Sequence, residues 1–160
     1  MENNTLSASK QKDVYQISLK LILKNDKGEV LILSAIRGGT FEGFHDLPGG
    51  RIDVDEFRVD FEDILKREIK EELGDIEVDI FTSAPVSMGR HLIPASLSST
   101  GSEMHVLYLF FEGQYLSGNI EISEEHRGYK WINLKNIVLE EYFSSGILEG
   151  MKRYAKQTRN

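Results

Sequence analysis

The sequence predicts a layered α/β or α+β domain in which helices cover a mixed β-sheet. Three patterns indicate this fold: apolar residues alternate over residues 15–24, and they follow helical spacing over 61–73 and again over 146–156. The chain has 160 residues, of which 40% are hydrophobic, and this is typical of one folded domain. We therefore expect a single domain over residues 13–160, preceded by a flexible polar segment, residues 1–12.

The first two predicted strands form a hairpin. In residues 15–24 apolar and polar side chains alternate, with Ile22 as the exception, which predicts a strand with one buried face. Residues 25–28 (Asn-Asp-Lys-Gly) are typical of a turn, and residues 30–33 then predict a partner strand. Glycines within residues 38–46 indicate a loop that leads to the sequence Leu-Pro-Gly-Gly at residues 47–50.

The central helix is predicted over residues 61–73. Asp60 is a suitable N-cap residue and Gly74 a suitable C-cap residue. The helical spacing predicts a packing face made of Phe61, Ile64, Leu65, Ile69 and Leu73.

Further strands are predicted farther along the chain, at residues 76–81, 106–111 and 129–132. The pattern is less clear between residues 82 and 90, and residues 93–103 are rich in Ser, Gly and Pro, which indicates a loop. Strands mixed with helices in this way are consistent with helices covering a mixed sheet.

Charge and composition exclude several classes of function. The net charge of −7 argues against a general affinity for nucleic acid, which requires a basic surface, although a divalent cation can bridge an acidic protein to a polyphosphate. The chain has no cysteine, which excludes disulfides and thiolate metal sites. The first ten residues are too polar for a signal peptide, and the longest apolar run, residues 106–111, is too short to span a bilayer. We expect a cytoplasmic protein that binds neither nucleic acid nor membrane.

Three carboxylates gather on one face of the central helix. Glu68, Glu71 and Glu72 are spaced i, i+3 and i+4, so their side chains are neighbours. Carboxylates this close repel one another unless a cation lies among them, and their hard oxygen ligands suit Mg²⁺ or Mn²⁺. A solvated glutamate-rich face is the alternative interpretation. The Pro-Gly-Gly turn that precedes the helix, at residues 48–50, favours a metal site that meets a phosphate-bearing substrate.

These segments together resemble the signature of the Nudix hydrolases: glycine, five residues, glutamate, seven residues, Arg-Glu, apolar, any residue, Glu-Glu, any residue, glycine, apolar. The first part is matched by Gly50 and Glu56, and the second by Arg67, Glu68, Ile69, Glu71, Glu72 and Gly74. Residues 46–49 and 124–132 also resemble this family, so that the similarity spans about residues 15–140. The resemblance implies a Nudix-like α/β/α sandwich with a mixed sheet covered by helices.

The chain departs from the family pattern in several places. Residues 57–66 separate Glu56 from Arg67, which is ten residues where the pattern has seven. Asp75 occupies the last apolar position, and His45 lies where many relatives have tryptophan. The longer spacing puts the expected contact between Glu56 and Arg67 in question, but every helix glutamate is present.

The resemblance implies an enzyme that uses Mg²⁺ or Mn²⁺ to hydrolyse a pyrophosphate bond in a nucleoside diphosphate linked to another moiety. Glu68, Glu71 and Glu72 would be the catalytic residues and would hold the metal together with the Gly50 carbonyl. Glu68 is the first candidate to orient or deprotonate the attacking water. Glu124 and Glu125 are alternatives, because that later segment can face the same metal.

Other residues receive secondary roles. The family pattern favours a supporting ion pair between Glu56 and Arg67, with phosphate contact by Arg67 as the alternative. The candidates for substrate binding are Arg37, Arg51, Phe44 and Glu125, with Phe41 as a further stacking candidate. Ordinary surface arginines are the competing interpretation for the first two. No histidine shows metal-ligand spacing, and core packing is expected for Trp131 and Tyr108.

Several functional alternatives stay open at this point. A Nudix fold can sense a nucleotide without cleaving it, but such a protein would be expected to lack helix glutamates. An isoprenoid diphosphate isomerase of the same fold needs a cysteine, and an RNA-decapping enzyme fits the acidic charge poorly. Candidate substrates are nucleoside triphosphates, nucleotide sugars, ADP-ribose and dinucleoside polyphosphates, selected by loops 38–46 and 90–103. The protein is expected to be a monomer or a homodimer.

Overall fold

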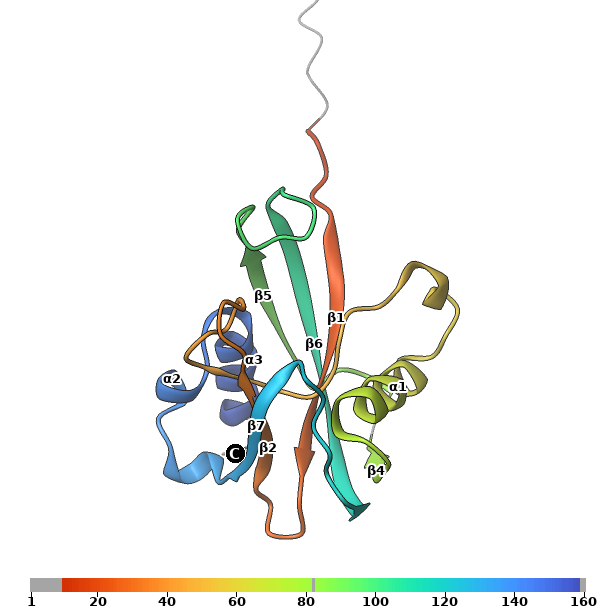
Figure 1. Ribbon diagram of the computed structural model, residues 1–160, viewed down its shortest axis with the longest axis vertical. Coiled ribbons are helices and arrows are strands. Elements are labelled where there is room, and N and C mark those ends of the chain that lie inside the picture. Colours follow the sequence, from red (N-terminus) through yellow and green to blue (C-terminus); the bar gives the residue numbers. More distant parts are fainter. Residues whose placement is uncertain (1–9, 82, 159–160) are drawn as a thin grey trace, which may run out of the picture.

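The computed structural model describes residues 10–81 and 83–158, so most of the segment expected to be flexible, residues 1–12, lies outside the described residues. The strands are β1 (Tyr15–Lys24), β2 (Val30–Ala35), β3 (His45–Asp46), β4 (Ile76–Ile80), β5 (Ser87–Ile93), β6 (Met104–Gly118) and β7 (His126–Ile132). The helices are α1 (Phe61–Leu73), α2 (Leu139–Tyr142) and α3 (Ser145–Gln157), with short 3₁₀ turns η1 (Val54–Glu56) and η2 (Leu134–Asn136). Figure 1 follows these elements along the chain.

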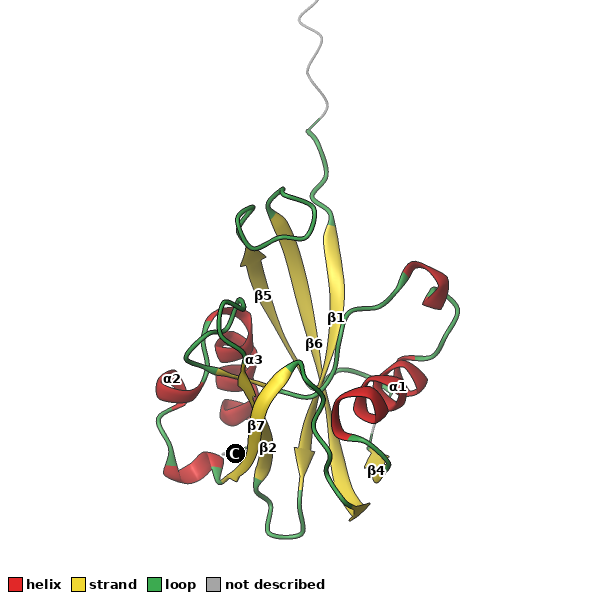
Figure 2. Cartoon of the chain, in the orientation of Figure 1, coloured by secondary structure: helices red, strands yellow, loops and turns green. Residues whose placement is uncertain are grey.

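The strands form one mixed sheet in the order β3-β2-β1-β6-β4, in which β5 also pairs with β6 and β7 also pairs with β2. The central strands β1 and β6 run parallel over their whole overlap, from Tyr15 opposite His105 to Lys24 opposite Gln114. The other pairings between named strands are antiparallel, including the predicted hairpin of β1 and β2. Helix α1 lies on one side of the sheet, and α2 and α3 lie on the other (Figure 2). The predicted α+β sandwich is confirmed.

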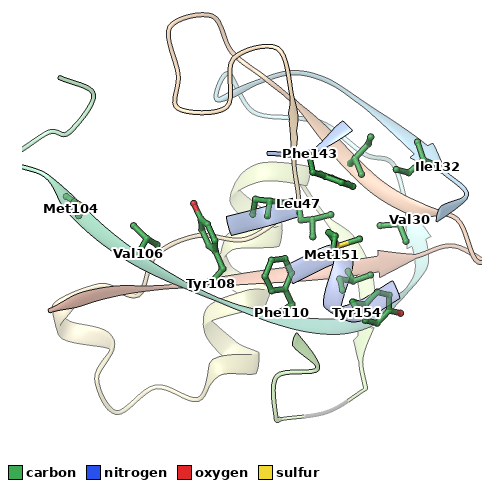
Figure 3. Close-up of a cluster of buried hydrophobic side chains, with 13 residues drawn as sticks. Val30, Leu47, Met104, Val106, Tyr108, Phe110, Ile132, Phe143, Met151 and Tyr154 are labelled. Carbon is green, nitrogen blue, oxygen red and sulfur yellow. The ribbon is translucent and has the colours of Figure 1, made fainter. Parts of the chain in front are cut away.

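Each side of the sheet has its own hydrophobic core. Leu19, Leu21 and Leu23 of β1 pack in the cluster beneath α1, whereas Ile22 packs in the cluster beneath α3. Figure 3 shows this second cluster, with Tyr108 and other residues of β6 among its members. The expectation of a single buried face for β1 is therefore wrong. A central strand covered by helices on both sides has little exposed surface, and Lys20 is buried with its apolar neighbours.

Helix α1 has the bounds that the sequence predicts. Its packing residues Ile64, Leu65, Ile69 and Leu73 are buried, and Phe61 packs edge-on against Phe111 while staying partly exposed. The predicted C-cap Gly74 has φ 80°, a conformation that favours glycine, and its N–H donates to the Lys70 carbonyl. Asp60 occupies the N-cap position, but its side chain makes no capping hydrogen bond within the described residues.

Strand β5 was not predicted, because its polarity is inverted. Ser87, Gly89 and His91 face the interior, while the apolar Met88 and Leu92 are exposed. The small side chains at Ser87 and Gly89 allow α3 to approach closely. A side chain at Gly89 would collide with the backbone of α3, and the Ser87 hydroxyl donates to the Gly150 carbonyl at 2.7 Å.

None of the helices in the described part of the chain has the length and hydrophobicity that crossing a bilayer requires.

Candidate active site

A cleft of about 370 Å³ lies beside helix α1. It is bounded by the turn before η1, by the C-terminal half of α1 and by the segment that precedes β7. These three segments contribute the lining residues Gly49, Gly50, Arg51, Asp53, Arg67, Glu68, Glu71, Glu72, Ser123 and Glu125. The structure thus brings together the acidic face of the helix, the glycine turn and one of the two glutamates of the later segment.

The glycine turn is hydrogen-bonded to the central strand β1. The Leu21 N–H donates to the Pro48 carbonyl and the Leu19 N–H donates to the Gly50 carbonyl, each at 2.8 Å. Between these bonds Gly49 has φ 131°, and a side chain there would collide with the Leu19 carbonyl. Only glycine fits, and its N–H then points to Glu72 of α1, with 2.8 Å between the nitrogen and Oε2.

Glu68 lies directly against the same turn. A side chain at Gly50 would occupy the space of the Glu68 carboxylate, so glycine is required there for this close approach. The Gly50 carbonyl oxygen, expected as a metal ligand, accepts one hydrogen bond from β1 and keeps a second lone pair. The Glu68 carboxylate therefore lies against Gly50, and carboxylate and carbonyl oxygens are the ligands that hard cations take.

The carboxylates in the cleft repel one another. Burial raises the pKa of Glu68, and the carboxylates of Glu72 and Glu71 raise it further, against the lowering effect of Arg67. The exposed fraction of the side chain falls from 58% for Glu71 to 13% for Glu68 and 7% for Glu72. A divalent cation would relieve the repulsion among these groups, so the residues present fit the metal that the sequence predicts.

Arg67 joins the carboxylates through its guanidinium group. Its Nε lies 2.7 Å from Glu56 Oε1 and its Nη2 lies 3.0 Å from Glu56 Oε2, which is a bidentate pair. Its Nη1 lies 2.9 Å from Glu68 Oε1 and 3.2 Å from Glu71 Oε2. The hydrogen bonds from Arg67 lower the pKa of Glu56. The longer spacing between Glu56 and Arg67 therefore does not separate them, because the turn η1 returns Glu56 to the helix.

We expect Arg67→Lys to lower the free energy of unfolding by about 1 kcal/mol, because lysine cannot form the bidentate pair and the site is partly exposed. Turnover should also fall, since Glu68 loses the group that orients it. Urea unfolding and initial rates measure both effects. The control Arg153→Lys, which alters an exposed pair with Glu149 within α3, should change neither quantity. Equal behaviour of the two variants would contradict this role for Arg67.

The amino-acid sequence matches the model of one known protein family. The model of the NUDIX domain matches residues 14–153, most of the chain.

The chain belongs to the Nudix family.

Relatives and solved structures extend this result. The nucleoside triphosphatase NudI of Escherichia fergusonii is 29% identical over 117 residues, which is 72% of this chain and 80% of the relative. The NudI protein of Escherichia coli O81 is 27% identical, over 73% of this chain and 81% of the relative. The crystal structure of the MutT protein from Methanosarcina mazei superposes with a TM-score of 0.69 at 22% identity, over 94% of this chain and 100% of that one. An ADP-ribose pyrophosphatase from Streptococcus suis has a TM-score of 0.57 at 17% identity, over 92% and 94%. At these identities the two structures support the fold alone. The match to the family model identifies the protein as a Nudix hydrolase.

Not every residue proposed for substrate binding lies at the Nudix cleft. Arg51 and Glu125 line it, but Arg37 and Phe44 are not among its lining residues, and Glu124 is exposed outside it. The Arg51 guanidinium also has contacts outside the acidic face of the helix, with its Nη1 at 2.8 Å from Gln16 Oε1 and at 3.3 Å from Met104 Sδ. The loop 38–46, which carries Phe44 and directly follows Arg37, contributes Phe41 to a second pocket instead.

This second pocket, of about 170 Å³, adjoins the Nudix cleft and shares Gly50 and Arg51 with it. Its wall contains a buried ion pair, with Lys20 Nζ 2.7 Å from Asp46 Oδ2. Tyr108 also lines it, and burial raises the pKa of its hydroxyl, so that the group stays protonated at neutral pH. The remaining lining residues are Ser18, Thr40, Phe41, His91, Ile93 and Val106. The expectation that Tyr108 serves only the core is therefore incomplete.

No role was predicted for His126 from the sequence, and the structure places it against Glu72, which lines the Nudix cleft. Its Nε2 lies 3.0 Å from Glu72 Oε1, and possible ligand atoms of Glu72, Glu125 and His126 lie within 4.8 Å of one another. Spacing along the chain could not reveal this contact, because 54 residues separate Glu72 from His126. The available signal was its position directly after Glu125, in a segment that resembles the family.

Proposed function

We propose that this Nudix hydrolase cleaves a pyrophosphate bond in a nucleoside diphosphate derivative with the help of Mg²⁺ or Mn²⁺, and that a nucleoside triphosphate is the first candidate substrate. The observation that carries this proposal is the convergence of Glu68, Glu71, Glu72 and Gly50 in one cleft that Arg51 also lines. The named activity of the NudI relatives supports the substrate class.

The proposed roles follow from position and burial. Glu68 and Glu72, which are mostly buried, hold the cation, and the more exposed Glu71 completes its ligand set. When bound, a divalent cation neutralises phosphate charge and lowers the pKa of a bound water. Glu68 accepts the proton of the attacking water, and Glu125 is the alternative base. The water oxygen bonds to one phosphorus, the bridging P–O bond breaks, and its electron pair leaves with the departing phosphate group.

The second pocket offers a place for the rest of the substrate. It contains an aromatic side chain, Phe41, together with the polar groups of Lys20, Asp46 and Tyr108. A pocket with a few convergent polar groups is typical of small-molecule sites. Because Arg51 lines both cavities, a phosphate chain could pass beside its guanidinium while the nucleoside enters the second pocket. The position of Arg51 thus supports its proposed role in phosphate binding.

A panel of nucleotides tests this proposal. Release of the hydrolysis products, which are nucleotides together with phosphate, pyrophosphate or a sugar phosphate, is measured by anion-exchange chromatography with Mg²⁺ or Mn²⁺ for nucleoside triphosphates, ADP-ribose, nucleotide sugars and dinucleoside polyphosphates. Chelation by EDTA should abolish the release, and we expect the highest kcat/KM for a nucleoside triphosphate. Preference for another member of the panel would correct the substrate and keep the reaction. No release from any compound, together with nucleotide-induced thermal stabilisation, would replace the hydrolase proposal with nucleotide sensing.

A further inference from the structure

Glu72 is held from two directions, and it is the most buried of the helix glutamates in the cleft. The Gly49 N–H donates to Oε2 at 2.8 Å, and His126 Nε2 lies 3.0 Å from Oε1. Each carboxylate oxygen therefore has one partner from the protein and further lone pairs available for a cation. One of these two contacts is a backbone group of the glycine turn, but the other is a side chain from a distant segment.

The segment before His126 is tied to the C-terminal end of α1. The Glu121 N–H donates to the Leu73 carbonyl at 2.9 Å, and the Ser123 N–H donates to the Glu72 carbonyl at 3.0 Å. These carbonyls belong to the last turn of the helix, where intrahelical partners are missing. The His126 N–H in turn donates to the Ser123 carbonyl. The segment that ends at His126 is thus hydrogen-bonded to the backbone of Glu72. The side chain of His126 contacts the side chain of the same glutamate.

A β-bulge orients the side chain of His126. In the pairing of β7 with β2, Ser34 lies opposite Gly128 and Ala35 lies opposite His126, so Arg127 is an extra residue in β7. An extra residue shifts the alternation of side chains, which is how bulges redirect residues next to active sites. His126 consequently points to the helix at the point where β7 begins.

The surroundings of the imidazole fix its tautomer. The side chain of His126 is 9% exposed, and its Nδ1 is buried without a hydrogen-bond partner among the described residues. A proton on Nδ1 would be an unpaired buried donor, whereas a proton on Nε2 is donated to Glu72. The geometry therefore favours a hydrogen bond that Nε2 donates to Glu72, because a carboxylate oxygen can only accept.

We propose that His126 is a positioning residue for the metal site, whose Nε2–H holds the Glu72 carboxylate in the orientation that binds the cation. The inference rests on the proposed function, because it assumes that Glu72 is a metal ligand. Supporting groups of this kind orient ligands, and their loss typically weakens metal affinity or activity about 10–100-fold. His126 itself does not touch the substrate in this proposal.

Two variants separate positioning from packing. His126→Phe keeps an aromatic ring of similar size and removes the donor, whereas His126→Gln keeps an N–H at about the same reach. We expect His126→Phe to raise the dissociation constant for Mn²⁺, measured by calorimetry without nucleotide, about 10-fold or more. His126→Gln should recover most of that loss. In the hydrolysis assay, His126→Phe should lower kcat more than it raises KM for the nucleotide.

The control is His105→Phe, since His105 lies at the surface and pairs with Asp13 and Glu103. It should leave Mn²⁺ affinity unchanged. If His126→Phe fails to fold, His126→Leu serves as the donor-free variant. Two results would overturn the positioning role and leave the proposed hydrolase intact. One is unchanged Mn²⁺ affinity in a folded donor-free variant. The other is an equal loss of Mn²⁺ affinity in the donor-free variant and in His126→Gln. If the unmodified protein binds no Mn²⁺, the proposed metal site and this inference fail together.

Discussion

Glu72→Gln should lower kcat by about 100-fold or more in the presence of Mg²⁺, because a neutral amide cannot replace the charged ligand that we propose Glu72 to be. The loss should exceed the 10–100-fold that is typical of residues which only support a ligand. Glu72 is buried, so the substitution also affects folding. One end of the amide is a donor and must face either the Gly49 N–H or His126, which should cost about 1–3 kcal/mol. Initial rates and urea unfolding measure the two effects separately.

The matched control is Glu62→Gln, on the exposed first turn of the same helix, where Glu62 pairs with Lys66. It removes the same charge from α1 but lies outside the cleft. We expect it to keep nearly full activity and to change stability by less than about 0.5 kcal/mol. Full activity of a folded Glu72→Gln protein would refute the assignment of the metal site, whatever its stability.

Gly49→Ala should lower the free energy of unfolding by about 3 kcal/mol or more. Alanine at φ 131° is strained, and its Cβ would collide with the Leu19 carbonyl of the central strand, so the turn must shift. The shift would also break the hydrogen bond from the Gly49 N–H to Glu72, and metal-dependent turnover should fall with stability. Urea unfolding followed by circular dichroism gives the stability change, and initial rates on the folded fraction give the change in turnover.

Gly28→Ala is the control for backbone strain alone. Gly28 has φ 74° in the hairpin between β1 and β2, and a Cβ there would meet no described atom within 4 Å. We expect it to cost about 1 kcal/mol and to leave activity unchanged. Similar destabilisation of the two variants would show that the collision with β1 contributes nothing and would contradict the close packing of the Gly49 turn.

Local patterns in the sequence predict much of the fold and part of the site. Helix α1 is predicted with its bounds, because its apolar spacing, its N-cap residue and its C-terminal glycine all agree. The gathering of Glu68, Glu71 and Glu72 follows from the same spacing, since neighbours on a helix are fixed by its pitch. Strand β5 was missed for a physical reason: its inward residues are small or polar where α3 approaches, so no apolar alternation marks it.

Contacts between distant segments could not be predicted from spacing. His126 reaches Glu72 only because the segment before it caps α1 and because a bulge redirects its side chain. The buried pair of Lys20 and Asp46 depends on how the glycine turn crosses β1, and a lysine in an alternating strand resembles an exposed residue. Arg37 was proposed for substrate binding by its residue type alone, and tertiary structure leaves it outside the Nudix cleft.

The binding of Mn²⁺, followed by electron paramagnetic resonance, tests the central claim most directly, because free Mn²⁺ gives a strong signal that is lost on binding. The protein is titrated with and without a non-hydrolysable analogue of a nucleoside triphosphate, beside the Glu72→Gln and Glu62→Gln variants, and Mn²⁺ bound by the nucleotide alone is subtracted. We predict that the unmodified protein and Glu62→Gln bind Mn²⁺ more tightly when the nucleotide is present, and that Glu72→Gln binds it much more weakly. Equal titrations for all three proteins would contradict a metal site at the acidic face of α1.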